Sequence, residues 1–244
     1  MTRTIRVPLG ELTAGERRID GDEAHYLVRV LRVRPGAILT AFDPVRRLEA
    51  AVTVLEVERD RVLARVSEPT PAPRAAEPEV TLVYCAGKGD KVDEVVRAAT
   101  ALAVSRVVVA TSERSVARGP TSPGRQKRWA AIALDAARQS GRGDVPELVG
   151  PLPFADALAR AESDGALKLC LEPDAEHALG ISLRERGDRP LVLLVGPEGG
   201  FSAQELAHAR DAGFDLMRLG TLILRTELAA VAALAAVLAH ERRG

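Results

Sequence analysis

Aromatic residues are scarce in this sequence of 244 residues, in which phenylalanine, tyrosine and tryptophan together make up 3%. A surface that stacks successive bases of single-stranded RNA needs several exposed aromatic rings, so we do not expect a dense platform of this kind. The apolar content is nevertheless 46%, so the core must consist mainly of alanine, valine and leucine. The length allows one large domain or two smaller ones.

Cysteine is also rare. Cys85 and Cys170 are far apart in the sequence, and the histidines lack the spacing of metal ligands, so no metal site is expected. Two such cysteines are typical of reduced thiols in a cytoplasmic protein. The motifs of dinucleotide-binding folds, P-loops and α/β-hydrolases are missing, which disfavours a nucleotide-binding oxidoreductase or a hydrolase.

Long apolar runs and an excess of charge are missing as well. The longest apolar run, residues 228–239, is well short of the roughly 20 residues that span a bilayer, and the first residues contain no signal-peptide core. We therefore expect a soluble cytoplasmic protein without membrane contact. The net charge is zero, but between Arg106 and Arg142 there are eight basic residues and two acidic ones. Arginine suits forked contacts with phosphate, so this segment is a candidate RNA surface as well as an ordinary solvated face.

A cluster of prolines divides the chain. Proline at high density disfavours helix and sheet, so residues 71–78 are predicted to be a linker. Residues 1–70 contain short strand-like runs, among them Leu48–Val57, and are predicted to form a β-rich domain. Within it, Asp22 is predicted to cap a helix that carries Arg29 and Arg32 on one face.

Strands alternate with helices in residues 79–244, which predicts a mostly parallel sheet covered by helices on both faces. The runs Val80–Cys85, Leu167–Leu171 and Leu191–Val195 are its clearest strands. Asp90 is predicted to cap the helix after the first of these strands, and Thr226 the last helix. The apolar stripe of that last helix is predicted to consist of positions 228, 231, 235 and 238, widened by Leu234 and Val237.

Two glycine-containing stretches stand where ligands commonly bind. The strand Leu191–Val195 is followed by G-P-E-G-G-F-S, in which Ser202 and Glu205 form a capping box for the next helix. The stretch L-G-T-L-I-L-R-T-E at 219–227 has the same order of strand end, glycine and helix start. Each could also be a strand-to-helix turn without a ligand. Arg225, among apolar residues, is expected to have a partner, which could be Glu198, Glu227 or an RNA phosphate.

These two stretches resemble the RsmE family of 16S ribosomal RNA methyltransferases, which belongs to the SPOUT superfamily. Further similar segments are the helix around His25–Arg32, the K-G-D-K at 88–91, and the short motifs at 113–116 and 139–142. The resemblance implies an α/β fold with an N-terminal PUA-like β-barrel at residues 1–70 and a C-terminal SPOUT domain with a trefoil knot at residues 79–244. It also implies a homodimer, because SPOUT enzymes build each site from two chains.

The activity implied by the resemblance is S-adenosylmethionine-dependent methylation of N3 of a uridine in 16S rRNA of the small ribosomal subunit, without a metal. Arg225 would stabilise negative charge on the base or hold a phosphate, and Glu198 would be a base or stabilise the turn. The implied cofactor-binding residues are Leu171, Gly196, Glu198, Gly199, Leu219, Gly220, Leu224 and Thr226. The implied RNA-binding residues are Arg29, Arg32, Arg114 and Arg142.

The sequence departs from the family pattern at several positions. Ala98 and Ala101 stand where the family usually has lysine and glutamate, Leu222 where it has arginine, and Leu228 where it has threonine. These departures leave open an alternative from another class, an RNA-binding or ribosome-assembly factor that keeps the fold but has weakened catalysis.

Overall fold

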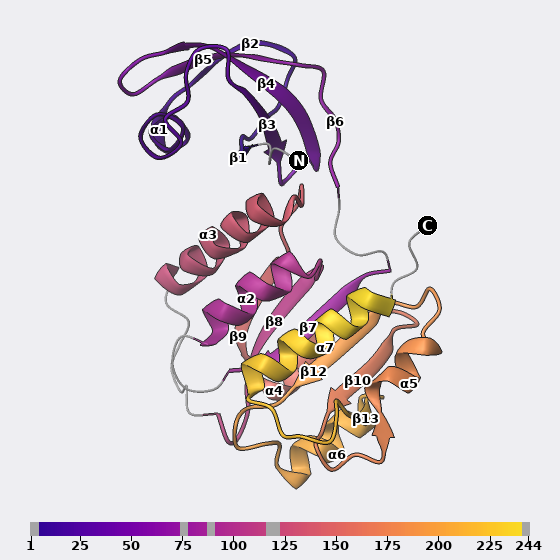
Figure 1. Cartoon of the computed structure of the whole chain (residues 1–244). Coiled ribbons are helices and arrows are strands. Elements are labelled where there is room, and N and C mark those ends of the chain that lie inside the picture. Colours follow the sequence, from indigo (N-terminus) through magenta and orange to yellow (C-terminus); the bar gives the residue numbers. More distant parts are fainter. Residues whose placement is uncertain (1–4, 74–77, 87–90, 116–122, 241–244) are drawn as a thin grey trace. The chain divides into compact units, whose positions relative to one another are not determined.

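The structure, a computed structural model, describes residues 5–73, 78–86, 91–115 and 123–240 (Figure 1). Contacts divide the chain into two compact units: unit 1 contains residues 1–74 and 137–145, and unit 2 contains residues 75–136 and 146–244. The predicted domain bounds stay a prediction. The predicted cap of α2, Asp90, lies outside the described residues. No helix within the described ranges is long and apolar enough to cross a membrane.

Unit 1 contains a six-stranded sheet in which most neighbours are antiparallel. Its strands are β1 (Arg6–Pro8), β2 (Gly15–Ile19), β3 (Ile38–Asp43), β4 (Leu48–Val57), β5 (Val62–Val66) and β6 (Thr70–Pro71). Their order is β1-β3-β4-β5-β2, and β6 pairs with β4. Alternate residues of β4, such as Val52 and Val54, are buried in the core together with Leu27. The predicted bounds of β4 are confirmed.

The helix predicted after residue 21 differs from the expectation in two respects. It consists of α1 (Gly21–His25) and a π-helical turn, η1 (Tyr26–Val30). Asp22 does not cap it, because Asp20 occupies the N-cap position and Asp22 lies in the first turn. Arg32 lies beyond the helix with a left-handed backbone, at a φ of 53°. The prediction that Arg29 and Arg32 share a helical face is therefore wrong.

Unit 2 is built on a seven-stranded sheet in which all neighbours are parallel, as the alternating pattern predicted. Its strands are β7 (Val80–Cys85), β8 (Arg106–Thr111), β9 (Glu147–Pro153), β10 (Leu167–Leu171), β11 (His177–Ala178), β12 (Leu191–Val195) and β13 (Asp215–Arg218). Their order is β11-β13-β10-β12-β7-β8-β9. The late strand β12 is thus inserted between β10 and β7. The trefoil knot stays a prediction.

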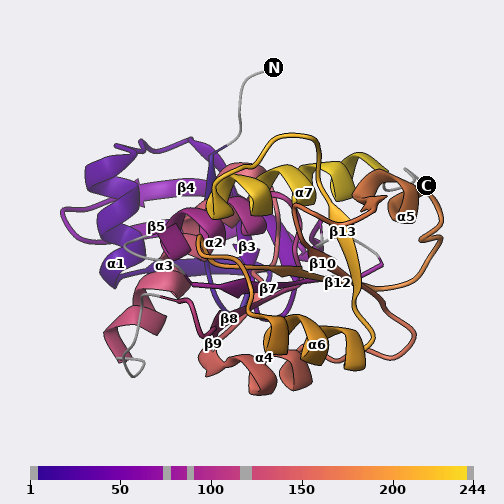
Figure 2. The same cartoon turned by 90° about the horizontal axis from the view of Figure 1, so that it is seen from below.

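Helices cover both faces of this sheet (Figure 2). On one face lie α2 (Lys91–Ala101), α5 (Leu179–Arg184) and α7 (Thr226–His240), and on the other α4 (Phe154–Arg160) and α6 (Ala203–Asp211). The long helix α3 spans Pro123–Ser140. Coverage on both faces explains why β12 is buried at every position and reads as a continuous apolar run. Under α4 and α6, the rings of Phe154 and Phe201 pack with centroids 5.7 Å apart.

The last helix, α7, corrects two expectations. Contrary to the prediction, Thr226 is the first residue of the helix and not its N-cap. The N-cap position belongs to Arg225, whose backbone carbonyl accepts from the Ala229 N–H. The predicted stripe is only partly right: Leu234 and Val237 are buried, but Leu228 is 51% and Leu238 39% exposed. The buried face is formed by Ala230, Ala233, Leu234 and Val237. The packed side is rich in alanine, which lets the helix approach its neighbours closely.

Candidate functional site

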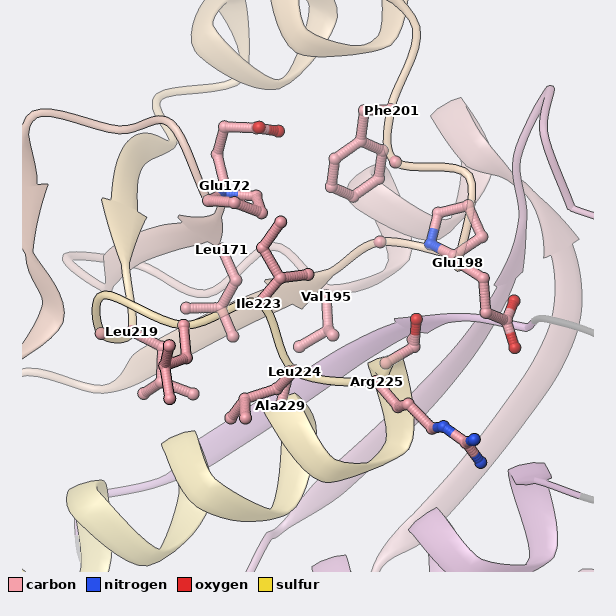
Figure 3. Close-up of a pocket in the computed structure, with 17 residues that line it drawn as sticks. Leu171, Glu172, Val195, Glu198, Phe201, Leu219, Ile223, Leu224, Arg225 and Ala229 are labelled. Carbon is pink, nitrogen blue, oxygen red and sulfur yellow. The ribbon is translucent and has the colours of Figure 1, made fainter.

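A cavity of about 360 Å³ opens where β10 and β12 end, beside the segment that follows β13 (Figure 3). Carboxyl ends of parallel strands meet at one edge of a sheet, and ligands of α/β proteins bind at this edge. Leu171 and Val195, the last residues of β10 and β12, contribute apolar side chains to its wall. The full lining is Leu171, Glu172, Pro173, Val195, Gly196, Pro197, Glu198, Gly200, Phe201, Leu219, Gly220, Leu222, Ile223, Leu224, Arg225, Thr226 and Ala229.

The segment from Gly196 to Ser202, here called the glycine loop, forms one rim of the cavity. A tight turn closes it, in which the Gly200 N–H donates to the carbonyl of Pro197 at 2.9 Å. Gly200 has a φ of 67°, a conformation that favours glycine. At Gly196 a Cβ would lie 2.9 Å from the ring of Phe201, so the ring can pack there only because the side chain is missing. At Gly220, by contrast, a Cβ would meet no atom within 4 Å.

The glycine loop ends in the predicted capping box, which the structure confirms. The Ser202 hydroxyl accepts from the Glu205 N–H, and the Glu205 carboxylate accepts from the Ser202 N–H at 2.9 Å. The second carboxylate oxygen of Glu205, which is buried, accepts from the Glu113 N–H at 2.8 Å. The neighbouring Arg114 guanidinium donates to the carbonyl of Gly199 at 3.0 Å. The segment after β8 is therefore fastened to the glycine loop at two points.

The charged residues at the rim pair differently from the expectation. Arg225 is exposed, and no side chain in the described ranges forms a hydrogen bond or an ion pair with its guanidinium, although its charge helps to lower the pKa of Glu227. Instead, the Lys91 ammonium donates to Glu198 and to Glu227, each at 3.0 Å. Figure 3 shows the side chains of Arg225 and Glu198 extending to the same side, away from Leu171. The rim thus combines a cation that is not hydrogen-bonded to a carboxylate with a pair of carboxylates bridged by Lys91.

The bridge shifts the pKa values of Lys91 and Glu227. Burial would raise the pKa of Glu227, but a backbone hydrogen bond, Lys91 and the charge of Arg225 together lower it. Hydrogen bonds to Glu227 and then to Glu198 raise the pKa of Lys91. The contribution of the bridge to stability is therefore complete at neutral pH. It is lost as the pH falls through the folded pKa of Glu227, or rises through the folded pKa of Lys91.

Three further titratable groups, Tyr84, Cys85 and Cys170, are buried in strands of the sheet. Burial, followed by the charges of Glu198 and Glu227, raises the pKa of Tyr84, whose buried hydroxyl has no hydrogen-bond partner among the described residues. Burial likewise raises the pKa of the thiols of Cys85 and Cys170. The parts of the chain that the structure describes contain no group of residues that could hold a metal ion.

The structure gathers most of the predicted cofactor-binding residues around the cavity. Leu171, Gly196, Glu198, Leu219, Gly220, Leu224 and Thr226 all line it, as does Arg225. Gly199 is outside the lining, and a Cβ there would point at Arg114 at 3.1 Å. The roles of all these residues stay predictions.

The predicted RNA-binding arginines lie in different environments. Arg29, Arg32 and Arg114 are exposed. Arg142 is 6% exposed, and its Nε donates to the Asp144 carboxylate at 2.6 Å, which is a structural contact within unit 1. The RNA contacts of these four arginines stay predictions. Because Arg142 is buried, its guanidinium is less accessible to RNA than those of the other three.

Comparison with known proteins agrees with this geometry. Residues 75–238 match the model of an RNA methyltransferase domain, and residues 19–67 match that of an RNA methyltransferase PUA domain. A relative from Mycobacterium tuberculosis, named ribosomal RNA small subunit methyltransferase E, is 35% identical over 225 residues, covering 90% of this chain and 84% of the relative. The chain belongs to the RsmE family. The Bacillus subtilis protein of the same name is 28% identical, covering 90% of this chain and 88% of its own.

Solved structures of similar proteins extend the comparison to the fold. An RsmE from Neisseria gonorrhoeae bound to S-adenosylmethionine matches with a TM-score of 0.84 and 30% identity over 96% of each chain. A Legionella pneumophila structure that contains the same cofactor matches with a TM-score of 0.87 and 27% identity over 98% of each chain. The predicted family and the predicted α/β fold with a PUA-like domain are therefore confirmed.

Several lining residues of this RsmE family member were not predicted. Glu172 and Pro173 follow β10 directly, so their place at the carboxyl end of a predicted strand was the available signal. Phe201 stands inside the glycine motif and could have been included on that ground. Lys91 was noticed as part of K-G-D-K, but nothing in the sequence indicates which carboxylates it meets.

We expect Glu205→Gln to destabilise the protein by about 2 kcal/mol, because the amide nitrogen cannot accept from one of the two backbone donors, which then remains buried and unpaired. Ser202→Ala removes the cap alone and should cost about 1 kcal/mol. Urea unfolding of both variants measures the difference. Losses of equal size would contradict the expectation that an unpaired buried donor costs more than the missing cap.

Proposed function

We propose that this protein transfers a methyl group from S-adenosylmethionine to N3 of a uridine in the 16S rRNA of the small ribosomal subunit. The observation that carries the proposal is the cavity itself, because both glycine stretches of the sequence border it. Relatives named ribosomal RNA small subunit methyltransferase E, and solved relatives that contain S-adenosylmethionine, support the same reaction.

The residues around the cavity fit this cofactor. Its volume lies within the range of small-molecule sites, which are mostly apolar with a few polar groups. Leu171, Leu219 and Leu224 would supply apolar walls, while the backbone of the glycine loop and of Gly220 would supply polar groups. When bound, S-adenosylmethionine supplies a methyl group that its sulfonium has already activated. The protein must then align this group with the acceptor and assist loss of the N3 proton.

We assign to Arg225 the role of stabilising negative charge on the uridine. Its guanidinium is exposed at the rim and forms no hydrogen bond or ion pair with a described residue, so it can meet negative charge that develops on the base, or a phosphate. Glu198 extends to the same side of the cavity (Figure 3). We assign to its carboxylate the role of the base that removes the N3 proton. Its hydrogen bond with Lys91 gives it a structural role as well.

The alternative, an assembly factor with weakened catalysis, is less well supported. Three of the four departures from the family pattern, at Ala98, Ala101 and Leu228, lie outside the residues that line the cavity. Leu222 lines it but is 79% exposed, so the missing arginine leaves the enclosed part of the cavity unchanged. The family matches of this chain support the catalytic function over the alternative.

Further parts of the proposal concern the molecule as a whole. We propose that residues 1–70 form an RNA-binding domain, that residues 79–244 form the catalytic domain, and that the protein acts in the cytoplasm. We also propose a homodimer. Its support is the apolar surface of exposed side chains on α7 and on the segment before it: Leu222, Ile223, Leu228 and Leu238.

The function is tested by incubating the protein with labelled S-adenosylmethionine and small subunits that lack the modification. We expect label on N3 of a single uridine of 16S rRNA. Gly220→Val should abolish both transfer and the thermal stabilisation by S-adenosylhomocysteine, because its side chain enters open space at the cavity wall. Gly180→Val, which also meets open space but lies in α5, is the matched control. Unlabelled subunits with the unaltered protein would refute the proposed function.

For Arg225→Ala and Arg225→Lys we expect turnover to fall at least about tenfold, equivalent to about 1.4 kcal/mol of transition-state stabilisation. Binding of S-adenosylhomocysteine should hardly change, because apolar walls and backbone groups provide it. Single-turnover methylation and calorimetry measure the two quantities. Arg210→Ala, an exposed arginine of α6, serves as the control. If Arg225→Ala turns over normally, Arg225 has no catalytic role.

The proposed homodimer predicts that Leu228→Glu yields a monomer, because a buried carboxylate would disrupt an apolar interface. Light scattering after size-exclusion chromatography measures the mass. As a control, Ile38→Glu introduces the same charge at an apolar residue of unit 1 that is 67% exposed. This variant should still have the mass of a dimer. A monomeric unaltered protein would contradict the proposal.

A further inference from the structure

Lys91 connects three segments that are remote from one another in the sequence. It is the first residue of α2, and its ammonium donates to Glu198 of the glycine loop and to Glu227 of α7. The two carboxylates follow it by 107 and 136 positions. A contact of this kind fixes the relative positions of chain segments that no regular secondary structure joins.

Both carboxylates belong to segments that form the cavity. Glu198 lines it directly, and Glu227 follows the lining residues Arg225 and Thr226. Lys91 itself is not among the lining residues. Its ammonium therefore acts on the cavity through the two carboxylates, one on each of the two glycine stretches.

The surroundings of the bridge indicate that it has more effect than an ordinary surface ion pair. The side chain of Lys91 is 26% exposed and that of Glu227 is 17% exposed, whereas that of Glu198 is 37% exposed. Exposed pairs contribute little because water screens them, and this screening weakens as the groups become covered. The contact with Glu227 is thus the better shielded of the two.

Loss of the ammonium would leave two carboxylates close together. Both lie within hydrogen-bond distance of the same nitrogen, so without it their mutual repulsion would separate the glycine loop from the start of α7. The buried hydroxyl of Tyr84 has no hydrogen-bond partner among the described residues, and Arg225 makes no hydrogen bond to either carboxylate. No other described cation is bonded to Glu198 or Glu227.

We infer that Lys91 is a positioning residue that holds the glycine loop and the start of α7 in the arrangement that forms the cavity. The inference rests on the proposed function in one respect, namely that the cavity binds S-adenosylmethionine. Lys91 would then control cofactor affinity without touching the cofactor.

The chemistry of lysine suits this task. A single ammonium nitrogen has three donors that can reach two carboxylates from different directions, whereas the donors of arginine lie in one plane. Lys91→Arg keeps the charge and should restore part of the function that Lys91→Met loses. Methionine keeps an unbranched apolar stem of similar length, so this variant removes mainly the charge and the donors.

A matched control is available at Lys168. Its ammonium also makes two contacts, to Glu162 at 2.7 Å and to the carbonyl of Ala212 at 2.9 Å, and its side chain is 16% exposed. It lies near the start of β10, at the edge of the sheet opposite to the cavity. Lys168→Met therefore removes a comparable bridge from the same unit without affecting the two glycine stretches.

The experiment measures two properties of the full-length variants. Hydrogen exchange followed by mass spectrometry should show faster exchange in residues 196–202 and 219–227 of Lys91→Met, and unchanged exchange there in Lys168→Met. Calorimetry should show the Kd of S-adenosylhomocysteine raised about tenfold in Lys91→Met, and by a smaller factor in Lys91→Arg. Glu227→Ala should make the further effect of Lys91→Met smaller, because the contact with Glu227 is then already lost and only the contact with Glu198 remains to be removed.

The outcomes separate the inference from the proposed function. If the unaltered protein does not bind S-adenosylhomocysteine, the proposed cofactor is wrong, and hydrogen exchange still tests the bridge. Faster exchange confined to the two glycine stretches in Lys91→Met supports the inference. Unchanged exchange, an unchanged Kd in a protein that binds the cofactor, or the same exchange pattern in Lys168→Met would overturn it.

Discussion

The position of β12 is the constraint on which the rest of unit 2 depends. All of Leu191–Val195 is buried, and the strand pairs in parallel with β10 on one side and β7 on the other. Because helices cover both faces of the sheet, a strand without a polar face is stable only in its interior. The loop that leaves β12 therefore begins in the middle of the carboxyl edge. A cavity at this edge follows from the order of the strands more than from any one side chain.

Hydrogen bonds from side chains fix the loops at this edge, because these loops lack the backbone pairing that fixes the strands. Loops carry polar backbone groups that need partners, and in the glycine loop some of these partners come from distant side chains. The carboxylate of Glu205 holds the end of the loop and the backbone of Glu113, while Arg114 holds the carbonyl of Gly199. Lys91 adds a contact between the loop and α7. The apolar lining gives the cavity its walls, and these polar contacts determine where the walls stand.

Three strands of unit 2, β7, β10 and β12, could be predicted because they are largely apolar runs, and their bounds agree with the prediction. The strand β2 could not, because Gly15–Ile19 contains three charged residues and is ordered by its pairing with β5. In α7, alanine and leucine occur on both faces of the helix, so periodicity could not decide which face is buried. That choice is made by the neighbouring elements, which the local sequence does not describe.

In the candidate site, too, features set by neighbouring residues could be predicted, whereas contacts between residues remote in sequence could not. Most of the cavity lining lies in the two glycine stretches, each of which follows a strand end, but the ion pairs of the rim depend on α2, which is remote in sequence. We expected a partner for Arg225, and the structure gives the two nearby carboxylates to Lys91 instead. The formal charges of Lys91, Arg225, Glu198 and Glu227 cancel, yet the carboxylates are bridged while the guanidinium remains exposed. The rim therefore carries no net charge that would repel a positively charged cofactor, although one of its two cations is not bonded to a carboxylate.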